Sequence, residues 1–309
     1  MIKAIAYETL SLVFKQIICN RARPPHPDRA GCFTTEFTSA DGTQLKGWAY
    51  RPQHHTSGTL FLQHGLCCHS LTMTDLALRL ADKFSMAAAC FDSRHHGLSG
   101  NAVPTFGYWE GRDIQAALDE ADRYGAPKPY IVIGDSLNGL ATQWVAANDP
   151  RVDAAIMLET PGWPWDAVGN FLYRFADQHK LSILPFIDRV GVIGKVIELA
   201  YGDDVLTKGQ LLGERIDPPQ APLVMYVIGD LDEYNWHCTR QVYDHWYQGE
   251  LGGWNVLPNP GDGHRKWFHL VEGAKHDDGK SDTYSIHRWP RYHEVIEALI
   301  ATVLARRNS

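Results

Sequence analysis

The 309-residue chain lacks several features that would place it in a broad functional class. It has no run or stripe of basic residues, and its net charge of −7 gives no electrostatic footprint for nucleic-acid binding. Its six cysteines form no C-x-x-C pair, and the adjacent Cys67 and Cys68 do not have the spacing of zinc ligands. No G-x-x-x-x-G-K-[ST] or G-x-G-x-x-G loop is present, which excludes the common nucleotide-binding motifs.

A metal site also has little support, although histidines stand in three conspicuous pairs: His54/His55, His64/His69 and His95/His96. Adjacent histidines in a strand or loop tend to point apart. No carboxylate or thiol completes a tetrahedral set at helical spacing. We therefore expect no metal ion and no other cofactor.

The N-terminal segment is apolar but lacks an uncharged stretch of the roughly 18 residues that span a membrane. Apolar residues recur there at helical spacing, which predicts an amphipathic helix: Ile2, Ile5, Ala6, Leu10, Val13 and Ile17. The linker "RARPPHPDRAG" completes an N-terminal unit of residues 1–31. We expect the helix to pack on its own domain or across a homodimer, with membrane contact the less favoured alternative.

We interpret the cysteines as reduced thiols, which indicates a cytoplasmic location.

From residue 32 onward, apolar strands alternate with amphipathic helices. A hairpin is predicted around Asp41-Gly42, and further strands at 59–65, 87–92, 129–134, 153–159, 222–230 and 266–274. Helices are predicted at 71–84, 109–125, from about 137 to 147, at 234–248 and from 290 to about 306. This alternation predicts an α/β fold in which a mostly parallel central sheet carries helices on both faces. The block at about 160–218 shows no clear strand and predicts a helical lid after the sixth strand of the 32–309 domain.

The segment "YIVIGDSLNGLAT" contains the string G-D-S-L, which names one hydrolase class. That class expects its serine near the start of the domain and a D-x-x-H near the end. Here Ser136 directly follows the fifth predicted strand, and the only D-x-x-H, at 92–95, lies upstream of it. The string is therefore a coincidence.

The local context of Ser136 predicts a nucleophile elbow instead. A serine between a buried strand and a helix sits on a tight turn, with its hydroxyl above the sheet and the helix N-terminus behind it. Gly134 and Gly139 provide the small flanking residues that close packing of strand and helix requires. Asn138 stands where the usual G-x-S-x-G motif has glycine, a mild departure because asparagine tolerates unusual backbone angles.

Several segments resemble landmarks of the α/β-hydrolase family, and they occur in family order. "QHGLCC" at 63–68 resembles the oxyanion-loop H-G after the third strand. "FDSRHHGLSG" at 91–100 resembles the D-x-R-G-H-G-x-S loop, with His95 in place of a glycine. "FGYWEGRDIQAAL" at 106–118 resembles the helix before the nucleophile strand in esterase- and peptidase-like members. The chain is thus similar to the α/β-hydrolases from about Cys32 onward, and the resemblance implies a carboxylesterase-like serine hydrolase.

A nucleophilic serine needs a base and an orienting carboxylate, which follow it in this family in the order acid, then histidine. Family spacing after the strand at 222–230 favours Asp232 as the acid, and Asp230 is the alternative. Asp232 could instead have a purely structural role as the N-cap of the following helix. His276 follows the last strand in "LVEGAKHDDG", which is similar to the family's G-A-x-H, and His264 is the alternative. The predicted triad is Ser136, Asp232 and His276.

The family resemblance implies that the backbone N–H groups of Leu66 and Leu137 form the oxyanion hole. His64 is expected to hold the loop before Leu66 in shape. Aromatic residues in the lid block could line an apolar pocket or simply pack the lid: Trp163, Trp165, Phe171, Tyr173, Phe175, Phe186 and Tyr201. The predicted substrate is a small-molecule ester or thioester. Alternatives are a serine peptidase, an acyl transferase or a non-catalytic binding protein of the same fold.

Overall fold

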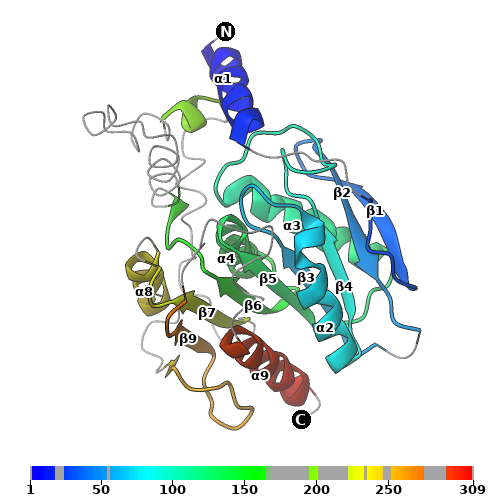
Figure 1. Ribbon diagram of the computed structural model, residues 1–309, viewed down its shortest axis with the longest axis vertical. Coiled ribbons are helices and arrows are strands. Elements are labelled where there is room, and N and C mark those ends of the chain that lie inside the picture. Colours follow the sequence, from blue (N-terminus) through cyan, green and yellow to red (C-terminus); the bar gives the residue numbers. More distant parts are fainter. Residues whose placement is uncertain are drawn as a thin grey trace.

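The computed structural model describes residues 2–17, 24–53, 56–164, 167, 195–200, 222–232, 235–245, 252–274 and 290–307. In these residues the chain builds a nine-stranded sheet in the order β1-β2-β4-β3-β5-β6-β7-β9-β8 (Figure 1). The strands are β1 (Cys32–Thr38), β2 (Gln44–Tyr50), β3 (Thr59–Gln63), β4 (Ala87–Phe91), β5 (Tyr130–Asp135), β6 (Val152–Leu158), β7 (Leu223–Gly229), β8 (Gly253–Trp254) and β9 (Lys266–Val271). The helices are α1 (Ile2–Ile17), α2 (Thr74–Phe84), α3 (Tyr108–Arg123), α4 (Leu137–Asn148), α8 (Trp236–His245) and α9 (Pro290–Arg307).

The sheet is mixed at one side and parallel elsewhere, which confirms the predicted fold class. β1 pairs with β2, and β2 with β4, in antiparallel register, while all other neighbouring strands are parallel. The predicted hairpin turn lies between β1 and β2, where Gly42 adopts a φ of 88° that favours glycine. The short strand β8 was not predicted, because two residues carry no periodicity that a sequence pattern could reveal.

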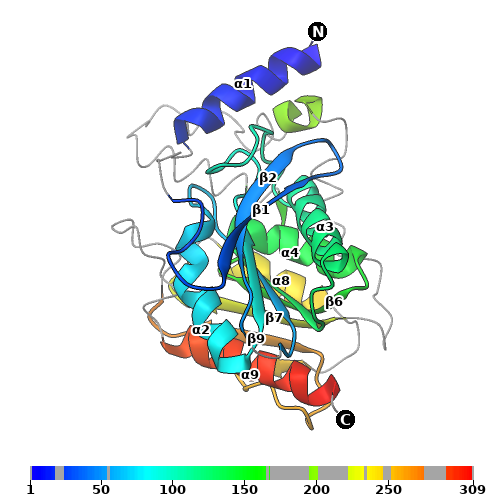
Figure 2. The same cartoon turned by 90° about the vertical axis from the view of Figure 1, so that its right-hand side faces the viewer.

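Helices cover both faces of the sheet (Figure 2). On one face α2 and α9 bury Leu76, Leu80, Ile296 and Leu299 against the strands. On the other face α3, α4 and α8 bury a second apolar cluster, which includes Trp144. Every residue of β5 and of β7 is buried, because the central strands are covered on both sides. Burial of one such large apolar side chain contributes roughly 1.5–3 kcal/mol, so both layers stabilise the fold.

The N-terminal helix α1 packs on the same chain. Leu10 is buried in a third apolar cluster together with Phe106, Leu140 and Ile197. Helical residues 195–200 lie beside α1 in both views (Figures 1 and 2). The predicted helix is confirmed, but Ile5 does not belong to its buried face, since 59% of its surface is exposed.

The predicted lid, at about 160–218, lies outside the described residues except for 160–164, 167 and 195–200. No helix in the described part of the chain is long and apolar enough to cross a membrane.

Candidate active site

Ser136 occupies a strained turn between β5 and α4. Its φ of 49° and ψ of −113° place a non-glycine residue in a sparsely populated backbone region, at a cost on the order of 1–3 kcal/mol. The Ser136 N–H donates to the carbonyl of Leu158 at 2.8 Å, and its carbonyl accepts from the N–H of Gly139 at 3.0 Å. The turn is therefore anchored both to β6 and to the first turn of α4, as a nucleophile elbow requires.

Two glycines allow the strand and the helix to approach. A Cβ atom at Gly134 would overlap the carbonyl of Asn138 and the hydroxyl of Thr142. A Cβ atom at Gly139 would overlap the side chain of Thr160, just after β6. Both positions therefore require glycine for steric reasons, which agrees with the role that the sequence predicts for them.

The two candidate acids have different surroundings. Asp232 is buried after β7, and its two carboxylate oxygens accept from the backbone N–H and the side-chain Nδ2 of Asn235, at 3.2 and 3.0 Å. Asp230 is exposed and accepts from the backbone N–H of Gly273 at 2.7 Å. Asp232 thus contacts the residue just before α8, and of the two candidate acids it is the buried one. Asn235 has no signal in the sequence beyond its position three residues after the acid.

His276 lies outside the described residues, but the chain immediately before it is placed. The N–H of Leu231 donates to the carbonyl of Ala274 at 3.0 Å, and the N–H of Asp230 donates to that of Val271 at 3.1 Å. A Cβ atom at Gly229 would overlap Ala274. Residue 274, two positions before the predicted base, therefore lies against the loop that carries Asp232.

The alternative base, His264, lies at the opposite edge of the sheet. It precedes β9, whereas Ser136 follows β5, and the strands from β5 to β9 are parallel. The carbonyl of His264 accepts from Arg306 of α9 at 2.9 Å. His269 is buried within β9, where burial and the charge of Arg291 lower its pKa to about 4.

The loop after β3 contains the predicted oxyanion donor Leu66. His64 is fully buried, and its Nε2 accepts from the backbone N–H of Ser93 at 3.0 Å. Since Nε2 is an acceptor, the proton of the neutral ring is on Nδ1, which donates to the carbonyl of Gly65 at 2.8 Å. His64 thus holds this loop, as expected. The second predicted donor, Leu137, is the first residue of α4, where backbone N–H groups have no partner within the helix.

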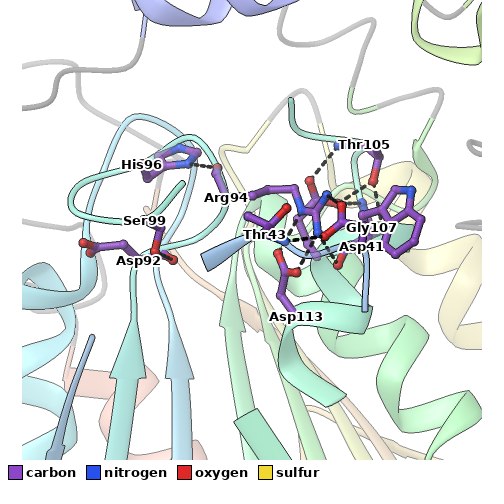
Figure 3. A network of polar contacts seen from close by, with 11 residues as sticks. Asp41, Thr43, Asp92, Arg94, His96, Ser99, Thr105, Gly107 and Asp113 are labelled. Carbon is purple, nitrogen blue, oxygen red and sulfur yellow. Dashed lines mark hydrogen bonds and ion pairs between the residues drawn. The ribbon is translucent and has the colours of Figure 1, made fainter. Parts of the chain in front are cut away.

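Polar contacts of the segment after β4 join it to α3 and to the hairpin between β1 and β2 (Figure 3). The carboxylate of Asp92 accepts from the N–H groups of Ser70 and Leu98, at 2.8 and 2.7 Å. Arg94 is fully buried and pairs with Asp113 of α3 at 2.6 Å and with Asp41 of the hairpin at 3.0 Å. Burial alone would lower the pKa of Arg94, but Asp113 outweighs it and raises the pKa above its usual range.

A further buried carboxylate, Glu159, was not singled out in the sequence. It follows β6, has a φ of 47°, and accepts from the hydroxyl of Tyr292 of α9 at 2.6 Å. Burial, and then the charge of Glu159, raise the pKa of Tyr292 well above its usual value, and Asp232 and Asp135 add to the effect. The one sequence signal of Glu159 is that a polar residue stands directly after a buried strand, which is also the signal that marks Ser136.

Comparison with known proteins agrees with this fold. Residues 54–189 match the family model described as serine aminopeptidase, S33. The esterase Pf2001 of Pyrococcus furiosus has 16% sequence identity and a TM-score of 0.61, over 94% of this chain and 98% of that one. The α/β-hydrolase GrgF from Penicillium sp. sh18 has 15% identity and a TM-score of 0.59, over 90% and 99%. No curated protein matches the chain in sequence.

The chain therefore has the α/β-hydrolase fold, which its resemblance to that family implied. The fold alone does not define the reaction. The bottromycin epimerase BotH is also similar, with 19% identity and a TM-score of 0.51 over 88% of this chain and 99% of that one. Any assignment of chemistry depends on the site.

Proposed function

We propose that this protein is a serine hydrolase that cleaves a carboxylic ester or thioester through an acyl-enzyme. The observation that carries the proposal is the strained backbone of Ser136, whose φ of 49° at the junction of β5 and α4 is the geometry of a nucleophile elbow. Strain of this kind persists only where surrounding contacts maintain it, and it concentrates at functional sites.

In the proposed mechanism the hydroxyl of Ser136 attacks the carbonyl carbon while His276 takes its proton. The backbone N–H groups of Leu66 and Leu137 stabilise the oxyanion that forms. His276 then returns the proton to the leaving alcohol or thiol, and water hydrolyses the acyl-enzyme by the same steps. Asp232 orients the imidazole, and its bonds from Asn235 would keep the carboxylate in a fixed rotamer.

The apolar character of the surroundings supports an apolar acyl or alcohol group. Leu66 and Leu137, the residues of the two proposed donors, belong to the third apolar cluster, with Val103 and Phe106. Trp163 packs partly buried against the cluster of α3 and α4. The other lid aromatics named from the sequence lie outside the described residues.

The proposal is tested with p-nitrophenyl esters of increasing acyl length and with a fluorophosphonate probe. We expect turnover by the wild-type protein, labelling that mass mapping assigns to Ser136, and loss of both in Ser136→Ala. Unchanged turnover in that variant, or labelling of another serine, would contradict the assignment.

A matched pair of variants tests the acid. Asp232→Asn should lower kcat by up to about 10⁴-fold, because an amide cannot stabilise the imidazolium that forms on the base. Asp230→Asn, two residues away but exposed, should remain within about twofold of wild type. Equal effects at the two positions would remove the support for Asp232.

A serine peptidase or acyl transferase is the second candidate, favoured by the match to the model described as serine aminopeptidase. Parallel panels of esters, thioesters and aminoacyl p-nitroanilides distinguish these reactions. A kcat/KM for the anilides above that for matched esters would favour the peptidase.

A further inference from the structure

Asn138 stands at the position where G-x-S-x-G has glycine, and its side chain makes hydrogen bonds that glycine cannot make. It is buried in the first turn of α4, with 2% of its surface exposed. Its Nδ2 donates to the backbone carbonyl of His64 and, at 2.7 Å, to the hydroxyl of Ser93. Because a primary amide has two N–H donors, both are engaged, and the group has none left for a substrate.

These bonds close a ring of three residues from three separate segments. Asn138 donates to His64 and to Ser93, and the backbone N–H of Ser93 donates to Nε2 of His64. The helix of the nucleophile is thereby joined to the loops after β3 and β4. All three residues are buried, so water does not compete for these bonds.

The ring determines the direction of one backbone N–H. The Nδ1–H of His64 donates to the carbonyl of Gly65, which shares a peptide group with the N–H of Leu66. A peptide group is planar and almost always trans, so its C=O and N–H point in opposite directions. Fixing the Gly65 carbonyl toward the ring of His64 therefore fixes the Leu66 N–H away from it. Asn138 donates to the carbonyl of His64, the residue before Gly65, and so anchors this loop.

We propose that Asn138 is a positioning residue for the oxyanion hole. Its amide joins α4, which presents the Leu137 N–H, to the loop that presents the Leu66 N–H. It therefore sets the separation and direction of the two donors. This inference rests on the proposed function of Ser136. A glycine at residue 138 leaves the carbonyl of His64 and the hydroxyl of Ser93 without this donor.

The test compares Asn138→Gly, which restores the family residue, with a control on the same helix. Thr142 lies one turn further along α4, is fully buried, and its hydroxyl has no hydrogen-bond partner within the described part of the chain. Thr142→Val has nearly the same shape and removes no such bond. Asn138→Ala serves as a second variant if the glycine variant does not fold.

Steady-state kinetics on a p-nitrophenyl ester, normalised by titration of active sites, separate positioning from general damage. We expect Asn138→Gly to lower kcat about 10- to 100-fold, somewhat less than complete loss of an oxyanion donor, with KM within about twofold. The Ki of a trifluoromethyl ketone, which forms a tetrahedral adduct, should rise by the same factor as kcat/KM falls. Thr142→Val should match wild type.

Two results would overturn the inference: a kcat per titrated site that is unchanged in Asn138→Gly, or a loss of kcat with no change in Ki. Hydrogen exchange provides a readout independent of activity. Peptides covering 62–70 should exchange at least about tenfold faster in Asn138→Gly than in Thr142→Val; equal rates would show that Asn138 does not hold the loop. If wild type shows no turnover and no labelling, the proposed function fails, and exchange still decides whether Asn138 anchors the loop.

Discussion

The turn at Ser136 and the loop after β3, residues 64–69, are joined by the bonds of Asn138, but different forces hold them. At the turn, shape decides: Gly134 and Gly139 let α4 approach the strands so closely that a single methyl group would overlap its neighbours. In the loop after β3, hydrogen bonds to buried polar side chains hold the backbone in place. These side chains are His64, Asn138 and Asp92. A steric requirement excludes a larger side chain, whereas a buried polar network is destabilised when one of its partners is removed. The two halves of the site should therefore fail in different ways.

The largest effect should come from the buried ion pair of Arg94 and Asp113, which belongs to the polar contacts after β4. Arg94→Met removes the partner of Asp113 and leaves a buried carboxylate without its counter-charge, which should cost about 3–5 kcal/mol of unfolding free energy. Urea denaturation measures this cost. The double variant Arg94→Met/Asp113→Leu should recover much of it, and a double variant no more stable than the single one would contradict the explanation.

The steric half is tested by Gly139→Ala. The added methyl group overlaps Thr160, and overpacking of this kind should cost about 3 kcal/mol and abolish activity, because the elbow must shift. Thr160→Ala in the same chain removes two of the three overlapping atoms, Oγ1 and Cγ2, but keeps Cβ, so it should restore part of the stability. Denaturation and active-site titration together measure both effects; a stable and active Gly139→Ala variant would refute the steric reading of the turn.

Acid should weaken the polar half specifically. Burial, and then the neighbouring His64, lower the pKa of His96 to about 3, so the unfolded chain binds this proton more readily than the folded one. Above about pH 6.5 His96 is neutral in both the folded and the unfolded chain and does not change the free energy of unfolding. As the pH drops from there toward 3, the unfolded chain binds the proton and the free energy of unfolding falls. Between pH 6 and 4.5 wild type should lose roughly 2 kcal/mol more than His96→Gln, which does not titrate. Parallel curves for the two proteins would show that His96 is not the group responsible.

The smallest effect should come from the second partner of Arg94. Asp41 lies on the hairpin with 21% of its side chain exposed, whereas Asp113 is buried. Asp41→Asn should therefore cost less than about 1 kcal/mol in the same denaturation experiment. A cost equal to that of Arg94→Met would mean that the hairpin contributes as much to the network as α3 does.

The sequence predicts the fold well because the signals are local. Central strands are continuous apolar runs, and Ser136 is recognisable because it stands between such a run and a helix. Local patterns failed where tertiary contacts decide the outcome. Ile5 has the helical spacing of a buried residue, yet it is exposed, whereas Ala6 and Leu10 of the same helix are buried.

The site was predicted only in part, for a related reason. Ser136, Asp232 and Leu66 lie at the carboxyl ends of their strands, where family order places them, whereas His276 stays a prediction outside the described residues. The role of Asn138 could not be predicted, because it depends on contacts with residues 45 and 74 positions away in the chain. A sequence pattern shows that a glycine has been replaced but not which groups the new side chain reaches.

The contact between Tyr292 and Glu159 joins residues 133 positions apart in the chain. During synthesis, β6 emerges from the ribosome well before α9. Until α9 follows, the carboxylate of Glu159 cannot accept the hydrogen bond from the hydroxyl of Tyr292. The buried contact next to the Ser136 turn, whose N–H bonds the Leu158 carbonyl, can therefore form only after α9 has been synthesised.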